Sequence, residues 1–397
     1  MDVSRARQEI PATQSTIYLN HGWSGPSPRR VVEAVNARLE YESYAGPTIP
    51  EVQESRRRIK DGARAAFARF IGATPEEIVL TDNTTDGINI ILNGLPWRDG
   101  DELITTTLEH GSGLVPSYYL RRREGVKVVI VELEASDTPK TVLAKFQAAM
   151  GPRTRLLLVS HIMYRNGLRL PLKELQEIAH QGGALALVDA AQSMGHLALD
   201  MGQLGCDFYA MPAHKWLLGP DGVGALYIRR DLIPIVEPRK VAGGAAAEYD
   251  PFGSFEPRVG EVRKYELTTS STPLLAGATA TVEFFEEIGM MAAEARIMDI
   301  SKRLRDALAN IPGVTLTSPR DGDLVSGLVS FCLESQEPRA LVEALWNRHR
   351  IVCRAVNYPA GVRFSVHFFN TEAEVDTVAQ AVEELAKSTV SPSAGSS

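Results

Sequence analysis

The sequence predicts an α/β protein whose large domain contains a mostly parallel, seven-stranded sheet, followed by a smaller α+β domain. First, apolar runs alternate with helical periods between residues 28 and 233, as in parallel sheets covered by helices on both faces. Second, the pattern changes after a loop-like stretch at 243–273. Third, 397 residues are enough for two or three domains of roughly 150 residues each.

The strands of the large sheet are expected at the apolar runs, which are 77–81, 101–107, 126–133, 154–160, 183–190, 206–211 and 224–228. Amphipathic stretches separate them, and the one at 170–183 ends in two glycines, as helices often do. Ligands of such sheets bind beyond the carboxyl ends of the strands. Polar residues that directly follow these runs are therefore candidates for a functional site.

The C-terminal part of the chain has a different pattern. Residues 243–273 are rich in Gly, Ser, Thr and Pro, and we expect a long loop there, which in compact proteins is often functional. A long helix is expected around 276–303. Alternating strands should follow at 313–319, 327–333 and 362–368. A last helix opens with Thr371 and Glu374 in capping-box spacing, and one face carries Val375, Val378, Val382 and Leu385.

These patterns divide the chain into four parts. Residues 1–25 form an N-terminal segment, and residues 26–255 form the large domain. Residues 256–390 form the small domain, with an active-site loop at its start. Residues 391–397 are small and polar, and we expect them to be a disordered tail.

Composition excludes several classes of partner. A net charge of −7 gives no electrostatic footprint for nucleic acid or for an anionic membrane. The first ten residues lack the apolar core of a signal peptide, and no run of 18 apolar residues occurs. The cysteines, Cys206, Cys332 and Cys353, are far apart and form no CxxC pair, which favours a reducing cytoplasm. No metal site is expected.

Two charged residues lie in otherwise apolar surroundings and suggest a cofactor. Lys215 precedes a glycine-rich turn, and a partly desolvated lysine can form a Schiff base with an aldehyde. Asp189 ends a predicted strand and can hold a positive charge on a heterocycle nitrogen. The stretch 83–87 joins a strand to a helix, whose free N–H groups make a phosphate seat. Each piece alone has an ordinary structural explanation, but their combination describes what pyridoxal phosphate requires.

The motifs "VDAAQS" (188–193) and "CDFYAMPAHKWLLGPDGVGALY" (206–227) resemble the class V aminotransferase group of fold-type I pyridoxal-phosphate enzymes. The likeness runs from "YLNHGWSGPSP" to "VRFSVHFFNTEAEVD", nearly the whole chain. That group includes cysteine desulfurases, selenocysteine lyases, isopenicillin-N epimerase-like proteins and cyst(e)ine C–S lyases. The resemblance implies the fold of a fold-type I pyridoxal-phosphate-dependent transferase.

The resemblance also assigns roles around the cofactor ring. Lys215 matches the lysine that bonds the cofactor aldehyde and later moves protons. Asp189 matches the carboxylate paired with the protonated pyridine nitrogen. Gln192 would hydrogen-bond the phenolic oxygen, and His110 matches the histidine stacked on the ring face.

The phosphate and the substrate have implied ligands as well. The phosphate would be held by Asn83, Thr84, Thr85 and His214. Thr269 matches the residue that reaches the phosphate of a neighbouring subunit, which implies a homodimer with shared active sites. Arg363 and Arg354 would bind the α-carboxylate of a small amino-acid substrate. The two terminal nitrogens of the Arg363 guanidinium can each donate a hydrogen bond to the carboxylate. Asn20 and His21 belong to a segment that lines the substrate side in relatives.

The chain departs from the group's pattern at three places. Pro212 stands where relatives often have a hydroxyl ligand for the phosphate. Tyr164 or Arg165 stands where many relatives have a cofactor-contacting asparagine, and Asn166 is shifted. The interval "CRAVNYPAGVR" between the two arginines contains no cysteine after Arg354, whereas cysteine desulfurases carry a persulfide-forming cysteine there.

These features favour a lyase that eliminates the β-substituent of cystine or a related sulfur amino acid, because such a reaction needs no catalytic thiol. An epimerase of the isopenicillin-N type is an alternative and would need a second acid, such as His21 or Tyr164. A class V aminotransferase or cysteine desulfurase-like enzyme, and a cofactor-binding scaffold without activity, also stay open. Substrate specificity should come from residues 243–254, the Tyr358 region and the partner subunit.

Overall fold

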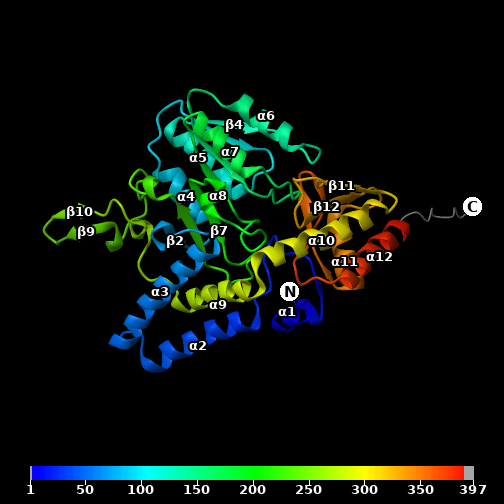
Figure 1. Cartoon of the computed structure of the whole chain (residues 1–397), viewed down its shortest axis with the longest axis horizontal. Helices are drawn as coiled ribbons and strands as arrows, with labels where there is room; N and C mark the ends of the chain where they lie inside the picture. Colours follow the sequence, from blue (N-terminus) through cyan, green and yellow to red (C-terminus); the bar gives the residue numbers. More distant parts are fainter. Residues whose placement is uncertain (1, 389–397) are drawn as a thin grey trace, which may run out of the picture.

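A computed structural model, which describes residues 2–388, shows a large seven-stranded sheet with a smaller domain beside it (Figure 1). The strands of the large sheet are β2 (Ile78–Thr81), β3 (Glu102–Thr106), β4 (Lys127–Val131), β5 (Thr154–Ser160), β6 (Leu185–Asp189), β7 (Phe208–Pro212) and β8 (Gly224–Ile228). Their order is β2-β8-β7-β6-β5-β3-β4. Strand β8 runs antiparallel to both of its neighbours, and the other pairs are parallel. The predicted mostly parallel seven-stranded sheet is confirmed.

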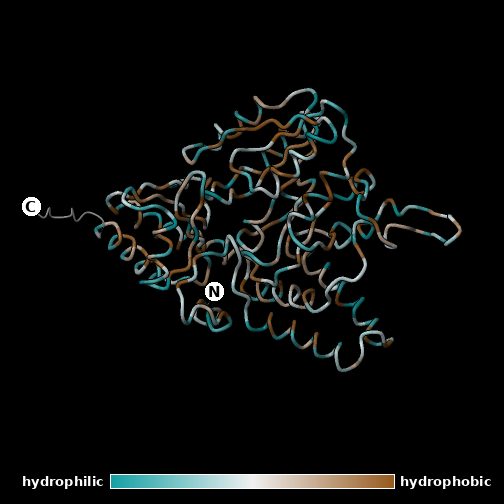
Figure 2. Tube along the Cα trace, turned by 180° about the vertical axis from the view of Figure 1, so that it is seen from behind, coloured by the Kyte–Doolittle hydropathy of each residue, from teal (hydrophilic) through white to brown (hydrophobic). Residues whose placement is uncertain are grey.

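The central strands are apolar throughout because both faces of the sheet are covered. In β5, Leu156 and Leu158 join the core on one face, while Leu157 and Val159 join the core on the other. The first core contains residues of α4 (Thr84–Gly94) and α5 (Gly111–Glu124). The second contains residues of the following helices: α3 (Pro50–Phe70), α6 (Pro139–Ala149), α7 (Leu172–Gln181) and α9 (Thr272–Ile288). Figure 2 shows hydrophobic segments running through the interior of the molecule.

The long helix expected around 276–303 is instead two helices. Helix α9 ends at Ile288 and α10 (Met290–Ala309) begins at Met290. Gly289 lies between them with φ +81°, a left-handed conformation that favours glycine and ends α9. Helix α9 packs on α2 (Arg29–Ala45) and α3 of the large domain. The predicted boundary between residues 255 and 256 stays a prediction.

The smaller domain contains an antiparallel sheet in the order β11-β12-β15-β14. Its strands are β11 (Val314–Leu316), β12 (Leu328–Leu333), β14 (Arg354–Asn357) and β15 (Ala360–Ser365), and its other helices are α11 (Pro338–His349) and α12 (Glu372–Ser388). The capping box predicted before α12 is present, because Glu374 accepts from the N–H of Thr371 and Thr371 accepts from the N–H of Glu374. The predicted α+β character is confirmed.

The N-terminal segment contacts both domains, and Ala6 and Ile10 belong to the apolar core that contains α3 and α9. After α1 (Val3–Glu9), strand β1 (Ile17–Tyr18) pairs in parallel with β13 (Ile351–Val352). Leu19 belongs to the apolar core of the small domain. This pairing carries residues 20–23 to the boundary between the two domains.

The segment 243–273 is more ordered than the loop predicted for it. It contains an antiparallel hairpin of β9 (Ala246–Tyr249) and β10 (Phe255–Pro257), which extends away from the body of the protein (Figure 1). The predicted tail, 391–397, lies outside the described residues. Between residues 2 and 388, no helix is long and apolar enough to cross a membrane.

Candidate active site

A cavity of about 370 Å³ lies beyond the carboxyl end of β6 and at the N-terminus of α4. It collects most of the residues predicted for the site. Its lining consists of Gly22, Trp23, Asn83, Thr84, Thr85, His110, Ser112, Tyr164, Asp189, Ala191, Gln192, His214, Lys215 and Arg354. Of these, Gly22, Trp23, Ser112 and Ala191 were not predicted from the sequence.

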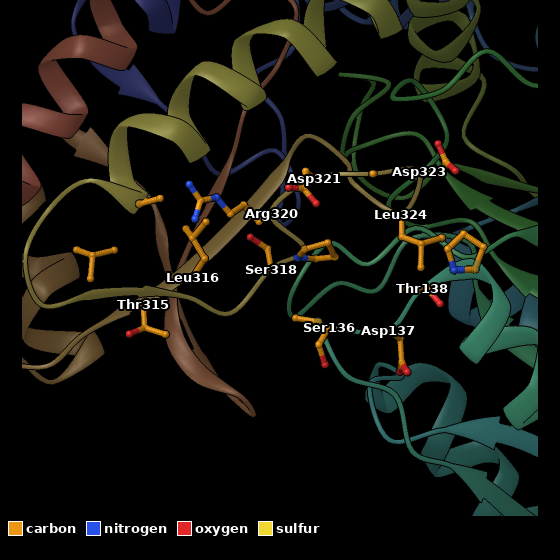
Figure 3. A pocket seen from close by; sticks show the side chains of 16 residues that line it. Ser136, Asp137, Thr138, Thr315, Leu316, Ser318, Arg320, Asp321, Asp323 and Leu324 are labelled. Atoms are coloured by element: carbon orange, nitrogen blue, oxygen red, sulfur yellow. The ribbon is translucent and has the colours of Figure 1, made fainter.

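A larger cavity of about 710 Å³ opens between the loop that follows β4 and the small domain (Figure 3). Its acidic groups include Asp137, Asp321 and Asp323. Asp137 already pairs with Lys145 at 2.7 Å. Because the smaller cavity instead brings together a half-buried lysine, a buried carboxylate and a helix N-terminus, we place the candidate active site there.

Asp189 and Lys215 influence one another inside the smaller cavity. Asp189 ends β6 and is buried, and its Oδ1 accepts the N–H of Ala191 at 2.8 Å. Burial raises the pKa of Asp189, while the charge of Lys215 opposes the rise. Burial lowers the pKa of Lys215 to about 8, and Asp189 opposes that fall. A lysine with this pKa has a substantial neutral fraction near neutral pH, so it can act as a nucleophile and as a base.

The first residues of α5 hold the imidazole ring of His110 in place, and the ring is uncharged at neutral pH. It is the N-cap of the helix, and its Nδ1 accepts the N–H of Ser112 at 3.1 Å. The Oγ of Ser112 lies 2.9 Å from the same nitrogen. Burial, then the positive charges of Lys215 and Arg354, lower the pKa of His110 to about 4. Because Nδ1 accepts, the proton of the neutral ring resides on Nε2.

The N-terminus of α4 provides an anion seat. Asn83 caps the helix by accepting the N–H of Asp86 at 3.0 Å, and the first helical N–H groups of Thr84 and Thr85 stay available. The buried Oγ1 of Thr84 has no hydrogen-bond partner within the described part of the chain. Thr85 donates its hydroxyl to Ser112 at 2.9 Å. These donors suit a phosphate group.

Two further predictions concern residues near this anion site. His214 lines the cavity with a buried Nδ1 that no described residue hydrogen-bonds, and burial lowers the pKa of this histidine. Pro212 ends β7 and has no side-chain donor. Ser112 lines the same cavity, but its hydroxyl already contacts His110 and Thr85, so no replacement for the missing ligand is assigned.

Gln192 joins the N-terminal segment to the cavity. Its Nε2 donates to the carbonyl oxygen of Gly22, and its Oε1 accepts from Nε1 of Trp216, both at 2.9 Å. Its second amide hydrogen stays free for a ligand. Gly22 must lack a side chain, because a Cβ there would lie 2.8 Å from a guanidinium nitrogen of Arg363 and 2.9 Å from Oγ of Ser365.

Arg363 and Arg354 are cross-strand partners in β15 and β14. Arg363 is fully buried and donates to the carbonyl oxygen of Tyr164 at 2.7 Å, and its Nε and second terminal nitrogen have no partner among the described residues. Burial, together with the charge of Arg354, lowers the pKa of Arg363 to about 9. Arg354 lines the cavity and stacks over Trp23 at 4.4 Å. The pair presents positive charge to an incoming anion.

Besides Arg363, three predicted residues do not line the cavity. His21 is fully buried against Tyr18, His367 and Phe369, and its Nδ1 contacts the carbonyl oxygen of Ser365 at 2.8 Å. Asn20 forms a bridge with Ser365. Thr269 is exposed, at φ +66°. Their roles in binding stay predictions.

Within the loop 161–169, one residue lines the cavity and another is buried elsewhere. Tyr164 lines it and meets the ring of His110 edge to face, with centroids 4.9 Å apart. Asn166 is buried away from it and accepts the N–H of Leu168 at 3.1 Å. Tyr164, and not Asn166, therefore lines the cavity.

Glu109 is a buried acid that the sequence analysis did not single out. It accepts from the hydroxyl and the N–H of Ser160 at 2.6 and 2.9 Å. Burial raises the pKa of Glu109 to about 7, the hydrogen bonds from Ser160 oppose the rise, and the charge of Asp189 adds to it. The only local signal was its position beside His110 after an apolar run.

The fold and the site define an enzyme that binds a phosphorylated aldehyde cofactor and a carboxylate-bearing substrate. The sequence pattern of the family "Aminotransferase class-V" matches residues 17–378. A probable cysteine desulfurase of Methanothermobacter thermautotrophicus is 31% identical, covering 97% of this chain and 98% of that protein. The isopenicillin N epimerase of Streptomyces clavuligerus is 32% identical, covering 97% of this chain and 98% of that protein.

A solved structure shares the fold as well. A cystine C–S lyase in complex with its reaction product cysteine persulfide superposes with a TM-score of 0.88 at 29% identity, covering 95% of this chain and 99% of that one. A mutant of that enzyme carries glycine covalently linked to its pyridoxal-phosphate cofactor. The chain belongs to the class V aminotransferase family, and it is a pyridoxal-phosphate-dependent enzyme.

The residues present fit this cofactor. Lys215 supplies the amine for its aldehyde, Asp189 a carboxylate for its ring nitrogen, and the start of α4 an anion seat with an unpartnered hydroxyl on Thr84. Between residues 2 and 388, no group of three or more His, Cys, Asp or Glu side chains could hold a metal ion.

Proposed function

We propose that the protein is a carbon–sulfur lyase that removes the β-substituent of cystine or a related sulfur amino acid. The products are pyruvate, ammonia and a thiol or persulfide. The observation that carries this proposal is the placement of the thiols. None of the three cysteines lines the active-site cavity.

Each cysteine lies in a part of the fold outside the cavity. Burial raises the pKa of Cys353 to about 12. Cys206 is buried in the core and contacts the Gln176 amide. Cys332 lies in β12, paired with Thr315 of β11. A desulfurase needs a thiolate that attacks the substrate sulfur, whereas a β-elimination does not.

The cavity residues can carry out the elimination. Arg363 would hold the α-carboxylate through its unpartnered guanidinium nitrogens. Lys215, with its pKa of about 8, takes the α-proton, and the Cβ–S bond then breaks with the electron pair leaving on sulfur. The bound cofactor supplies an electron sink for the resulting carbanion. Asp189 would hold the ring nitrogen of the cofactor, and its carboxylate would stabilise the protonated form of that nitrogen.

We also propose a cytoplasmic homodimer with shared active sites. Thr269 supports this because it is exposed and lies outside the cavity of its own chain. The test is light scattering of the purified protein at micromolar concentration. A monomer with full activity would contradict the shared site.

The main experiment loads the protein with pyridoxal phosphate and supplies cystine, S-substituted cysteines and cysteine. We expect pyruvate and a visible absorbance band that borohydride removes, with neither from Lys215→Ala. No pyruvate from any of these substrates, at full cofactor occupancy, would exclude the lyase.

A second candidate function is epimerisation, which the relative from Streptomyces clavuligerus and the placement of Tyr164 favour. Tyr164 lies in the cavity and could return a proton to the opposite face of Cα. Incorporation of deuterium at Cα with inversion of configuration would identify this reaction. A half-reaction that yields pyridoxamine phosphate would instead identify a transaminase. Full cellular function of a Lys215→Ala variant would indicate a scaffold.

A further inference from the structure

Arg165 follows Tyr164, which lines the cavity, and it contacts Tyr358 of the small domain. It lies in the loop between β5 and α7, and its guanidinium sits over the rings of Tyr164 and Tyr358, 5.0 and 5.9 Å from their centroids. One of its terminal nitrogens donates to the carbonyl oxygen of Tyr358 at 3.1 Å. Its Nε is buried and has no hydrogen-bond partner in the described part of the chain.

Arg165 belongs to a group of three arginines that face one histidine. The charges of Arg354, Arg165 and Arg363 all lower the pKa of His110. No member of this group forms an ion pair with a carboxylate of residues 2–388, although the whole chain has 49 acidic residues against 42 lysines and arginines. The cavity's own acid, Asp189, faces Lys215.

Clustered, partly desolvated cations repel one another unless anions compensate them. The α-carboxylate of an amino acid compensates one guanidinium, and the fully buried Arg363 has free nitrogens for it. Arg354 and Arg165 are left without an anionic partner. Both guanidinium groups lie over aromatic rings, Arg354 over Trp23 and Arg165 over Tyr164, and the buried Nε of Arg165 has no hydrogen-bond partner among the described residues.

We propose that Arg165, together with Arg354, binds a second anionic group at the far end of the substrate side chain. The substrate class is then a sulfur amino acid with a distal carboxylate, and cystine meets this requirement. This inference rests on the proposed function insofar as the site must bind an amino acid.

The test compares substrates that differ in distal charge. The wild-type enzyme should use S-carboxymethylcysteine with a KM about tenfold or more below that of S-methylcysteine, as expected for charge-assisted hydrogen bonds. Arg165→Gln should raise the KM of S-carboxymethylcysteine by about tenfold or more, with the KM of S-methylcysteine changed less than about twofold. The matched control is Arg121→Gln, because Arg121 also stacks on a tyrosine, Tyr118, but is exposed on α5.

Equal loss of activity on both substrates would show that Arg165 only holds the Tyr358 turn, and would overturn the inference. So would a wild-type enzyme that prefers the neutral substrate.

A binding measurement separates this inference from the lyase activity. α-Methylglutamate and its neutral counterpart α-methylglutamine lack an α-proton and a sulfur, so they bind without elimination. Calorimetry should give at least about tenfold tighter binding of the anionic probe, a preference that Arg165→Gln removes. If the preference is found but no substrate yields pyruvate, the distal site stands and the lyase proposal fails. Equal affinities for the two probes would overturn the distal site.

Discussion

Glu109 accepts both the hydroxyl and the main-chain N–H of Ser160, at 2.6 and 2.9 Å, and so ties the segment after β3 to the end of β5. This buried acid lies close enough to Asp189 for the two charges to interact. Burial raises the pKa of Glu109 from its ordinary 4.5 to about 7. The folded protein therefore holds this proton more tightly than the unfolded chain does.

A first prediction follows from that proton. Because the folded protein binds the Glu109 proton more tightly, this proton contributes to the free energy of unfolding in full below pH 4.5. The contribution is lost as the pH rises through about 7. Glu109→Gln keeps an acceptor for Ser160 but cannot ionise. Urea unfolding at pH 5 and pH 8, in the same cofactor state, should show the variant gaining stability relative to the wild type at the higher pH. A difference that stays constant between the two pH values would contradict a raised pKa.

A second prediction concerns the amine of Lys215. In protein stripped of cofactor, the rate of bonding to added pyridoxal phosphate should rise with pH, with a midpoint near pH 8, because only the neutral amine reacts. The measurement is the growth of visible absorbance after mixing. Asp189→Asn should move the midpoint to lower pH, since Asp189 raises the pKa of Lys215. A midpoint near the ordinary value of 10.5 would show that the amine is not desolvated.

A third prediction uses a matched pair of glycines. A Cβ at Gly22 would approach Arg363, Gln192 and Ser365 within 3 Å, so Gly22→Ala should lower the free energy of unfolding by about 1–3 kcal/mol and raise KM. Gly62 lies inside α3 with nothing within 4 Å of its added Cβ. Gly62→Ala should raise stability by about 1 kcal/mol with unchanged KM. Chemical denaturation and steady-state kinetics of both variants measure these effects. Similar KM values for Gly22→Ala and the wild type would contradict the tight approach.

A fourth prediction separates elimination from desulfuration. Cys353→Ala and Cys332→Ala should each keep pyruvate formation from cystine within about twofold of the wild type, because neither thiol reaches the cavity. Cys353→Ala should cost about 1 kcal/mol of stability, since its side chain is buried. Pyruvate assays and thermal melts give both values. Loss of turnover in folded Cys353→Ala would point to a thiol mechanism instead.

The sequence predicted the elements whose signals are local. The strand that ends in Asp189 is a short apolar run, and the start of α4 follows from Asn83 and the residues after it. The turn after β7 that carries Lys215 lies within one specific motif. The helix break at Gly289 and the hairpin inside 243–273 were missed, because neither interrupts a strong periodicity of the surrounding sequence.

Taken alone, the sequence determined the fold class and the cofactor, because the motifs that indicate them are patterns between near neighbours in the chain. The tertiary structure decided which distant residues meet. It paired β1 with β13, placed Arg363 against Tyr164 and Gly22, and buried Glu109 near Asp189. Such contacts join residues that are far apart along the chain, and their energies depend on burial and packing that no local spacing records.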